Sequence, residues 1–242
     1  MPAQRVNSPN QLIAALPAAM RTRFIDDCTR VNLVLGSDLC DEGERMRYVY
    51  FPIDSFISVL KTIDGQSTLE VGMIGSEGMY GYNVILGQSL APLRALTQGA
   101  GVAWRMELAT FRRRLGDMPA LRRLLHCYVG VLLRQLAQTA ACTRFHVVEE
   151  RLARWLLMTQ DRAHSDSFDV TQEFLAFMLG VRRVGVTTAA GALQLRKLIR
   201  YKRGSMTILD RGRLEAVACT CYRSDLEIYR QGLAAISTRQ RS

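Results

Sequence analysis

The stretch from Gln172 to Leu198 reads QEFLAFMLGVRRVGVTTAAGALQLRKL. With Gln172 as position one, Ala176 falls at position five, Gly180 at nine and Val186 at fifteen. This spacing is typical of two helices joined by a tight turn. A small residue at Ala176 allows the helices to cross closely, Gly180 ends the first helix with a positive φ, and Val186 fixes the second helix on the first. We therefore predict a helix-turn-helix, the element that places a helix in the DNA major groove.

The ends and faces of the two predicted helices follow from residue type and period. Thr171 is a suitable cap for the first helix, and Glu173 is favourable beside its positive end. In the second helix, apolar residues at three-to-four spacing face inward. The residues left on the outside or its edges are the candidates for DNA contact: Arg182, Arg183, Thr187, Thr188 and Gln194. Because the first turn of a recognition helix reaches base edges, Arg183, Thr187 and Thr188 are the candidates for direct readout.

The segment after the second helix, Ile199 to Leu209, predicts a short hairpin that turns at Gly204. Its cations Arg200, Lys202 and Arg203 suit phosphate contacts, as on the wing of a winged helix. The alternative is that these cations are solvated side chains on an ordinary small helical domain. Spacing, hairpin and charge together favour the winged helix-turn-helix.

The charge of the chain is concentrated near this segment. The 242 residues carry a formal net charge of +10, with 32 Lys and Arg against 22 Asp and Glu. Between Thr171 and Arg213 lie nine basic and two acidic residues. With 48% hydrophobic residues the composition is neither disordered nor fibrous. No run of about 18 apolar residues and no signal peptide is present, so we expect a cytoplasmic protein without a membrane partner.

The N-terminal half has a different pattern. From Val31 to Met106, short apolar pieces alternate with turn-forming residues, which favours a small antiparallel barrel or sandwich. Asp64 and Gly65 form the clearest hairpin turn. Before these pieces, Ser8 is the predicted cap of an N-terminal helix with Pro9 at its first position.

A long helix is predicted after Pro119. Six residues recur along it at three-to-four spacing and form one apolar stripe. Taken alone, a stripe this narrow favours a helix packed on its own domain over a coiled-coil seam. A second helix is predicted from Val147 to Gln160. The stripe on the first of these two helices consists of Leu121, Leu125, Tyr128, Leu132, Leu136 and Thr139.

The cysteines predict no metal site and no iron–sulfur cluster. Cys28 and Cys40 are too few for a cluster that needs four thiolates. Cys142-x₃-His146 spaces two ligands one helical turn apart, but no second pair is near it in sequence, which favours buried packing. The paired Cys219-x-Cys221 likewise lacks two further ligands nearby. Because no Ser-His-Asp set or carboxylate pair with a shared site is present either, we predict that the protein is not an enzyme.

The whole chain resembles the CRP/FNR (catabolite activator) superfamily of bacterial transcription regulators. The most specific pieces are Tyr50-Phe51-Pro52 leading to Ile57-Ser58-Val59, the segment Glu70 to Gly78, and Gly180 to Val186 with its wing. The resemblance implies an α+β fold: an N-terminal β-roll of the cyclic-nucleotide-binding type (a jelly roll), a long connecting dimerisation helix and a C-terminal winged helix-turn-helix. In this family the long helix pairs with its partner, so the stripe from Leu121 to Leu136 becomes the predicted dimer interface.

Two positions depart from the family pattern. Cyclic-nucleotide-binding members carry a Gly-Glu pair about ten residues before an Arg and a small residue. Here Arg94-Ala95 matches the phosphate-binding pair, but Gly81 is followed by Tyr82 where the ribose-binding Glu would stand. We therefore expect an effector site that includes Gly81, Tyr82, Arg94 and Ala95 but does not bind cAMP.

The resulting prediction divides the chain into a sensor domain (1–116), a dimerisation helix (117–146) and a DNA-binding domain (147–242). We expect a homodimeric, sequence-specific regulator on a pseudo-palindromic double-stranded DNA operator, with RNA polymerase as a further partner. An unidentified small-molecule effector at the roll would control it, and no metal or cluster is expected. Two alternatives stay open: a ligand-sensing module that acts through protein partners, and a regulator whose roll binds no effector.

Overall fold

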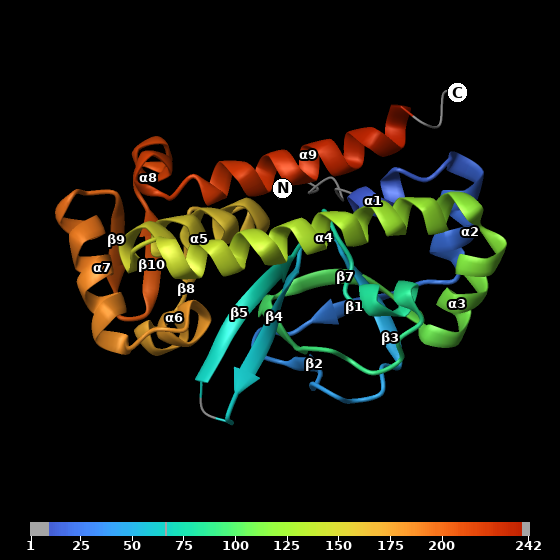
Figure 1. Cartoon of the computed structure of the whole chain (residues 1–242), viewed down its shortest axis with the longest axis horizontal. Coiled ribbons are helices and arrows are strands. Elements are labelled where there is room, and N and C mark those ends of the chain that lie inside the picture. Colours follow the sequence, from blue (N-terminus) through green and yellow to red (C-terminus); the bar gives the residue numbers. More distant parts are fainter. Residues whose placement is uncertain (1–9, 66, 239–242) are drawn as a thin grey trace, which may run out of the picture. The chain divides into compact units, whose positions relative to one another are not determined.

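A computed structural model describes residues 10–65 and 67–238, and it divides into two compact units (Figure 1). Among the described residues, unit 1 comprises 10–59, 74–132 and 229–238, and unit 2 comprises 60–65, 67–73 and 133–228. Most strands precede the long helix α4 (Pro119–Phe145), and most helices follow it. The α+β class with an N-terminal β domain and a C-terminal helix-turn-helix is confirmed.

The strands of the N-terminal half form two antiparallel sheets. Their bounds are β1 (Thr29–Leu33), β2 (Asp38–Cys40), β3 (Tyr48–Pro52), β4 (Phe56–Ile63), β5 (Ser67–Ile74), β6 (Arg94–Gly99) and β7 (Gly101–Glu107). One sheet has the order β1-β7-β3 and the other the order β2-β6-β4-β5. The apolar pieces of the sequence correspond to these strands, and the central strands bury successive residues: β3 buries Val49 to Pro52, and β4 buries Phe56 to Leu60.

The predicted hairpin turn is confirmed. Asp64 and Gly65, between β4 and β5, have φ values of 53° and 66°. Positive φ at two successive residues is what the tight turn of a twisted hairpin requires, and Asp-Gly is one of the dipeptides that adopt it readily.

Three short helices and a 3₁₀ turn, η1 (Tyr82–Leu86), complete unit 1. Asn10, not Ser8, caps α1 (Gln11–Ala14), because its side chain accepts hydrogen bonds from the backbone of Leu12 and Ile13. Ser8 and Pro9 lie outside the described residues. The other two helices, α2 (Ala18–Asp26) and α3 (Leu108–Asp117), bury aromatic rings against β3. Phe51 lies 5.2 Å from Phe24 and 6.2 Å from Phe111 between ring centroids.

Helix α4 does not present the predicted stripe to solvent. Leu121, Leu125 and Tyr128 are fully buried in unit 1, and the Tyr128 hydroxyl accepts a hydrogen bond from the Met79 backbone at 3.1 Å. These three side chains are therefore unavailable to a second protomer. Leu132 is half-buried, and Leu136 is exposed.

Unit 2 is mainly helical. Helix α5 (Val148–Ala163) packs against α7 (Arg183–Leu195) and α8 (Arg211–Val217), and α6 (Gln172–Leu179) packs against α7. Leu152, Leu156 and Val186 are fully buried in the resulting core. Three short strands, β8 (Ser167–Asp169), β9 (Ile199–Lys202) and β10 (Ser205–Ile208), form a small sheet of order β8-β10-β9. A last helix, α9 (Cys221–Thr238), had no counterpart in the sequence-based prediction.

The compact units differ from the three predicted sequence segments. The division falls within α4, between residues 132 and 133, and residues 229–238 group with unit 1. Among the described residues, no helix is both long enough and apolar enough to span a bilayer.

Candidate nucleic-acid interface

The helix-turn-helix forms as its spacing predicted. Thr171 caps α6, because its hydroxyl accepts a hydrogen bond from the Phe174 backbone at 3.1 Å. Gly180 ends α6 with a φ of 61°, and Val186 is fully buried between the helices. Glycine suits position 180 because of its backbone conformation, and a Cβ there would also approach the Leu69 side chain of the same unit to 3.0 Å.

The N-terminal turn of α7 exposes the predicted readout residues. Arg182 stands at the N-cap, and Arg183, Thr187 and Thr188 are all exposed. The Thr187 hydroxyl donates to Gln172 Oε1 at 2.8 Å, which ties the recognition helix to the start of α6. The Thr188 hydroxyl donates a hydrogen bond within its own helix, to the Val184 carbonyl at 3.0 Å. Thr188 is therefore freer than Thr187 to turn toward a ligand.

Gln194 has a different position from the one predicted. It is half-buried, and its Oε1 accepts a hydrogen bond from the Tyr201 backbone at 2.9 Å. The side chain thus connects the end of α7 to β9. We interpret Gln194 as a residue that positions the wing rather than one that reads bases.

The wing is a tight hairpin. Arg203 and Gly204 separate β9 from β10 with φ values of 51° and 82°, the positive pair of a two-residue turn. The Tyr201 hydroxyl donates to the Val170 carbonyl at 2.9 Å and anchors β9. Arg200 and Lys202 flank Tyr201 and are exposed, so both point away from its anchored side.

The cations of this surface differ in whether they are paired. In the described part of the chain, five of them on the first turn of α7 and on the wing have no ion-pair partner: Arg182, Arg183, Arg200, Lys202 and Arg203. Two others counted in the basic excess are neutralised. Arg196 pairs with Glu149 at 3.0 Å, and Arg211 pairs with Asp161 at 2.7 Å. Free positive charge is therefore gathered on the first turn of α7 and on the wing.

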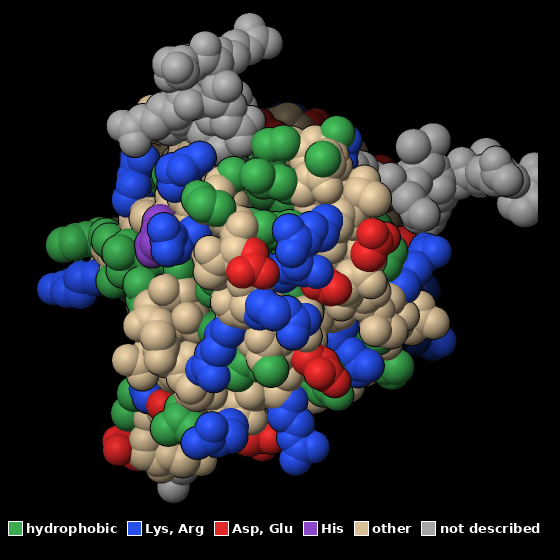
Figure 2. All heavy atoms as spheres, turned by 90° about the vertical axis from the view of Figure 1, so that its right-hand side faces the viewer, with side chains coloured by type: hydrophobic (Ala, Val, Ile, Leu, Met, Phe, Trp, Pro, Cys, Tyr) green, Lys and Arg blue, Asp and Glu red, His purple; other side chains and the backbone are tan. Residues whose placement is uncertain are grey.

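Unit 1 presents its charges differently. Arg114 pairs with Asp27, and Arg23 lies 3.8 Å from Asp117. Figure 2 shows the side of the molecule that carries α2 and α3, where basic and acidic side chains are interspersed. Such a surface offers no continuous basic patch to a polyanion.

The predicted effector residues do not form an open phosphate site. Arg94 Nε and Nη2 donate to Asp38 at 2.8 and 2.9 Å, and this hydrogen bonding raises the pKa of Arg94. Its charge and its planar donor edge are thus already used by a carboxylate. Gly81 has a structural role, because its φ is 97° and a Cβ there would lie 2.6 Å from Val49 Cγ1. Tyr82 is half-buried and Ala95 fully buried.

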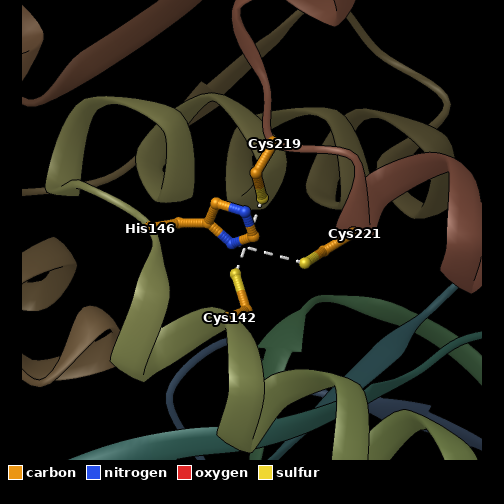
Figure 3. Close-up of side chains that lie close together, drawn as sticks. All are labelled: Cys142, His146, Cys219 and Cys221. Carbon is orange, nitrogen blue, oxygen red and sulfur yellow. Dashed lines mark hydrogen bonds between the residues drawn. The ribbon is translucent and has the colours of Figure 1, made fainter.

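Two candidate ligand pairs, Cys142 with His146 and Cys219 with Cys221, are far apart in the sequence but lie together in unit 2. Figure 3 shows Cys142 and His146 facing Cys219 and Cys221, with all four ligand atoms within 4.8 Å of one another. The premise that neither pair has further ligands nearby is therefore wrong. The reason is tertiary: α4 ends beside the α8–α9 connection, about 75 residues away in sequence.

Comparisons with known proteins agree with this geometry. Residues 150–217 match the model of the Crp-like helix-turn-helix domain. No curated protein is detectably similar to the chain in sequence.

Solved structures share the fold at low identity. The c-di-GMP-responsive global regulator CLP of Xanthomonas campestris is 16% identical, with a TM-score of 0.66 over 79% of this chain and 99% of that one. FixK2 of Bradyrhizobium japonicum is 15% identical, with a TM-score of 0.67 over 79% and 98%. A transcriptional regulator of the CRP family from Thermus thermophilus is 18% identical, with a TM-score of 0.65 over 78% and 96%. Residues 150–217 thus match a Crp-like helix-turn-helix domain, and the fold of the chain is that of these solved regulators.

Proposed function

We propose that the protein is a cytoplasmic transcription regulator, and not an enzyme, that binds a pseudo-palindromic DNA operator as a homodimer. The observation that carries the proposal is the set of five unpaired cations on α7 and the wing. Phosphate contacts need free cations, because each contact gains affinity by releasing counterions from the duplex.

These five cations suit two kinds of contact with DNA. Arg200, Lys202 and Arg203 on the wing suit phosphates, which position the protein without reading sequence. Arg183 on the first turn of α7 suits the O6 and N7 atoms of guanine, a contact that discriminates by about 1 to 3 kcal/mol.

Val184 adds an apolar element to the same turn. Val184 is 68% exposed and directly follows Arg183. An exposed valine beside a guanine-reading arginine suits the C5-methyl group of thymine. We expect half-sites in which a guanine and a thymine lie close together.

The dimer interface is proposed on the second half of α4. Leu133 and Leu136 are both exposed, and Ala137 and Ala140 continue the exposed face at helical spacing. Such a face supports pairing with a second copy, which would set two recognition helices about 34 Å apart along the duplex. Sedimentation should show a dimer that Leu133→Arg dissociates, whereas Leu209→Arg, at an exposed leucine after the wing, should leave it intact.

The β domain is proposed as the sensor of a small effector other than cAMP, with RNA polymerase as a further partner of the DNA-bound dimer. The pairing of Arg94 with Asp38 supports this exclusion, since a cyclic phosphate would have to displace a carboxylate held by two hydrogen bonds. Calorimetry with cAMP should therefore show no binding. A micromolar response would overturn our interpretation of Arg94 and Tyr82.

Selection of genomic fragments by the full-length protein tests the function itself. We expect an enriched palindromic motif and an affinity that falls steeply with salt. Enrichment of no motif, together with a flat salt dependence, would favour the module that acts through protein partners.

A further inference from the structure

The strongest feature outside the DNA-binding surface is the cluster of Cys142, His146, Cys219 and Cys221 in unit 2. Two of its members come from the end of α4, where the His146 backbone donates to the Cys142 carbonyl at 3.1 Å. This one-turn spacing puts both side chains on one face. The other two flank the start of α9, and the Tyr222 backbone donates to the Cys219 carbonyl at 3.1 Å in the turn between them. Each pair is therefore fixed by its own backbone.

The distances match the ligand polyhedron of a single small ion. Cys142 Sγ lies 3.5 Å from Cys219 Sγ, and Cys221 Sγ lies 3.5 Å from His146 Nδ1. Tetrahedral zinc, with bonds of about 2.3 Å to sulfur and 2.0 to 2.1 Å to nitrogen, requires ligand separations of about 3.8 Å for S···S and 3.5 Å for S···N. An iron–sulfur cluster needs room between its thiolates for several iron and sulfide atoms, which ligand atoms within 4.8 Å of one another do not leave.

The surroundings of the cluster are those of a supported metal site. The three cysteines are buried, and Gln138 Nε2 donates to Cys221 Sγ at 2.8 Å. Three thiolates around Zn²⁺ leave a net charge of about −1, which favours a nearby cation. The Arg154 guanidinium provides one: it interacts electrostatically with Cys142 and Cys219 and is held by Asp225 at 2.6 Å.

From this geometry we propose that Cys142, His146, Cys219 and Cys221 bind one Zn²⁺ ion in a closed, structural Cys₃His site. Four protein ligands leave no open coordination position, so the ion performs no catalysis. It joins the end of α4 to the α8–α9 connection within unit 2 and stabilises that unit. The proposal does not depend on DNA binding.

Metal analysis of the full-length protein, purified without chelators, is the direct test. We expect one zinc ion per chain, and a visible absorption spectrum of tetrahedral, thiolate-bound cobalt after Co²⁺ replaces Zn²⁺. Cys219→Ser should lower the zinc content several-fold, whereas Cys127→Ser, at another cysteine of α4, should leave one zinc bound. Gln138→Ala should retain the fold and weaken zinc affinity about 10- to 100-fold, as loss of a supporting hydrogen bond does in other sites.

Three outcomes would overturn the proposal. One is full-length protein without zinc even after reconstitution under reducing conditions. A second is cobalt-loaded protein whose spectrum is that of an octahedral, oxygen-bound ion. The third is a disulfide between Cys142 and Cys219 in protein kept reduced, found by mass spectrometry of its peptides. The direct test is the metal content of the wild-type chain. It therefore stays valid even if one of the variants fails to fold.

Discussion

Two arginines of unit 1 differ from those on the proposed DNA-binding surface of unit 2. In unit 1, Arg94 and Arg114 each meet a carboxylate, Asp38 and Asp27 respectively. On α7 and the wing of unit 2, by contrast, Arg183, Arg200 and Arg203 have no such partner among the described residues. The comparison shows that a count of basic residues does not locate a binding surface. An arginine is available to a phosphate only where the fold supplies no acid for it, because a paired guanidinium must first give up its carboxylate.

The largest effect is expected on the wing. Replacing Arg200, Lys202 and Arg203 together by alanine removes three phosphate interactions per protomer and should lower operator affinity on the order of 100-fold. The slope of log affinity against log salt should become less steep by about 0.9 for each phosphate that is no longer neutralised. The measurement is a salt titration by fluorescence anisotropy.

A matched triple variant in unit 1 controls for bulk charge. Arg45, Arg47 and Arg122 are also exposed, and their replacement removes the same charge. We expect near wild-type affinity and slope. Equal losses in the two variants would show that net charge, and not a docking surface, drives binding.

The next effect is on specificity. Arg183→Ala should relax base preference at one operator position by about 1 to 3 kcal/mol, because it removes a bidentate interaction with guanine. Lys202→Ala should instead weaken all sequences alike. Binding to a library of single-base operator variants distinguishes the two. If Arg183→Ala instead weakened binding to all operator variants alike, Arg183 would contact the phosphate backbone of the DNA and not a base.

A smaller effect concerns stability. The Arg114 hydrogen bond lowers the pKa of Asp27 in the folded state, so the pair stabilises the fold above the ordinary carboxylate pKa and loses that contribution as pH falls through the lowered value. Asp27→Asn should cost about 1 kcal/mol near neutral pH. The cost should begin to fall below about pH 4 and should vanish only once the pH lies below the lowered pKa of Asp27. Denaturant unfolding at several pH values is the measurement, and a cost that persists in acid would contradict the charge assignment.

The smallest effect is expected at Arg94. Since Asp38 already neutralises its half-buried side chain, Arg94→Ala should leave both operator affinity and salt slope unchanged. Its cost in stability should stay below about 1 kcal/mol, as for other surface ion pairs. A loss of operator affinity would show that Arg94 acts in signal transmission despite its partner.

Local patterns in the sequence predicted much of the fold. The spacing of Ala176, Gly180 and Val186 located the helix-turn-helix because these positions depend on size and backbone conformation, which are properties of single residues. The hairpin at Asp64-Gly65 was predictable for the same reason. The prediction that the stripe faces a second protomer was wrong for Leu121 and Leu125, which are buried. The helical period of apolar residues shows that they share one face of the helix, but it does not show what covers that face.

The sequence by itself thus determined the winged helix-turn-helix, the β domain and the long helix, because each follows from short-range spacing, turn chemistry and apolar period. Only the tertiary structure decided which cations are free, where Gln194 binds, and that Cys142 and His146 meet Cys219 and Cys221. These outcomes depend on contacts between residues far apart in the chain. No local pattern encodes such a contact, since it arises from how whole elements pack.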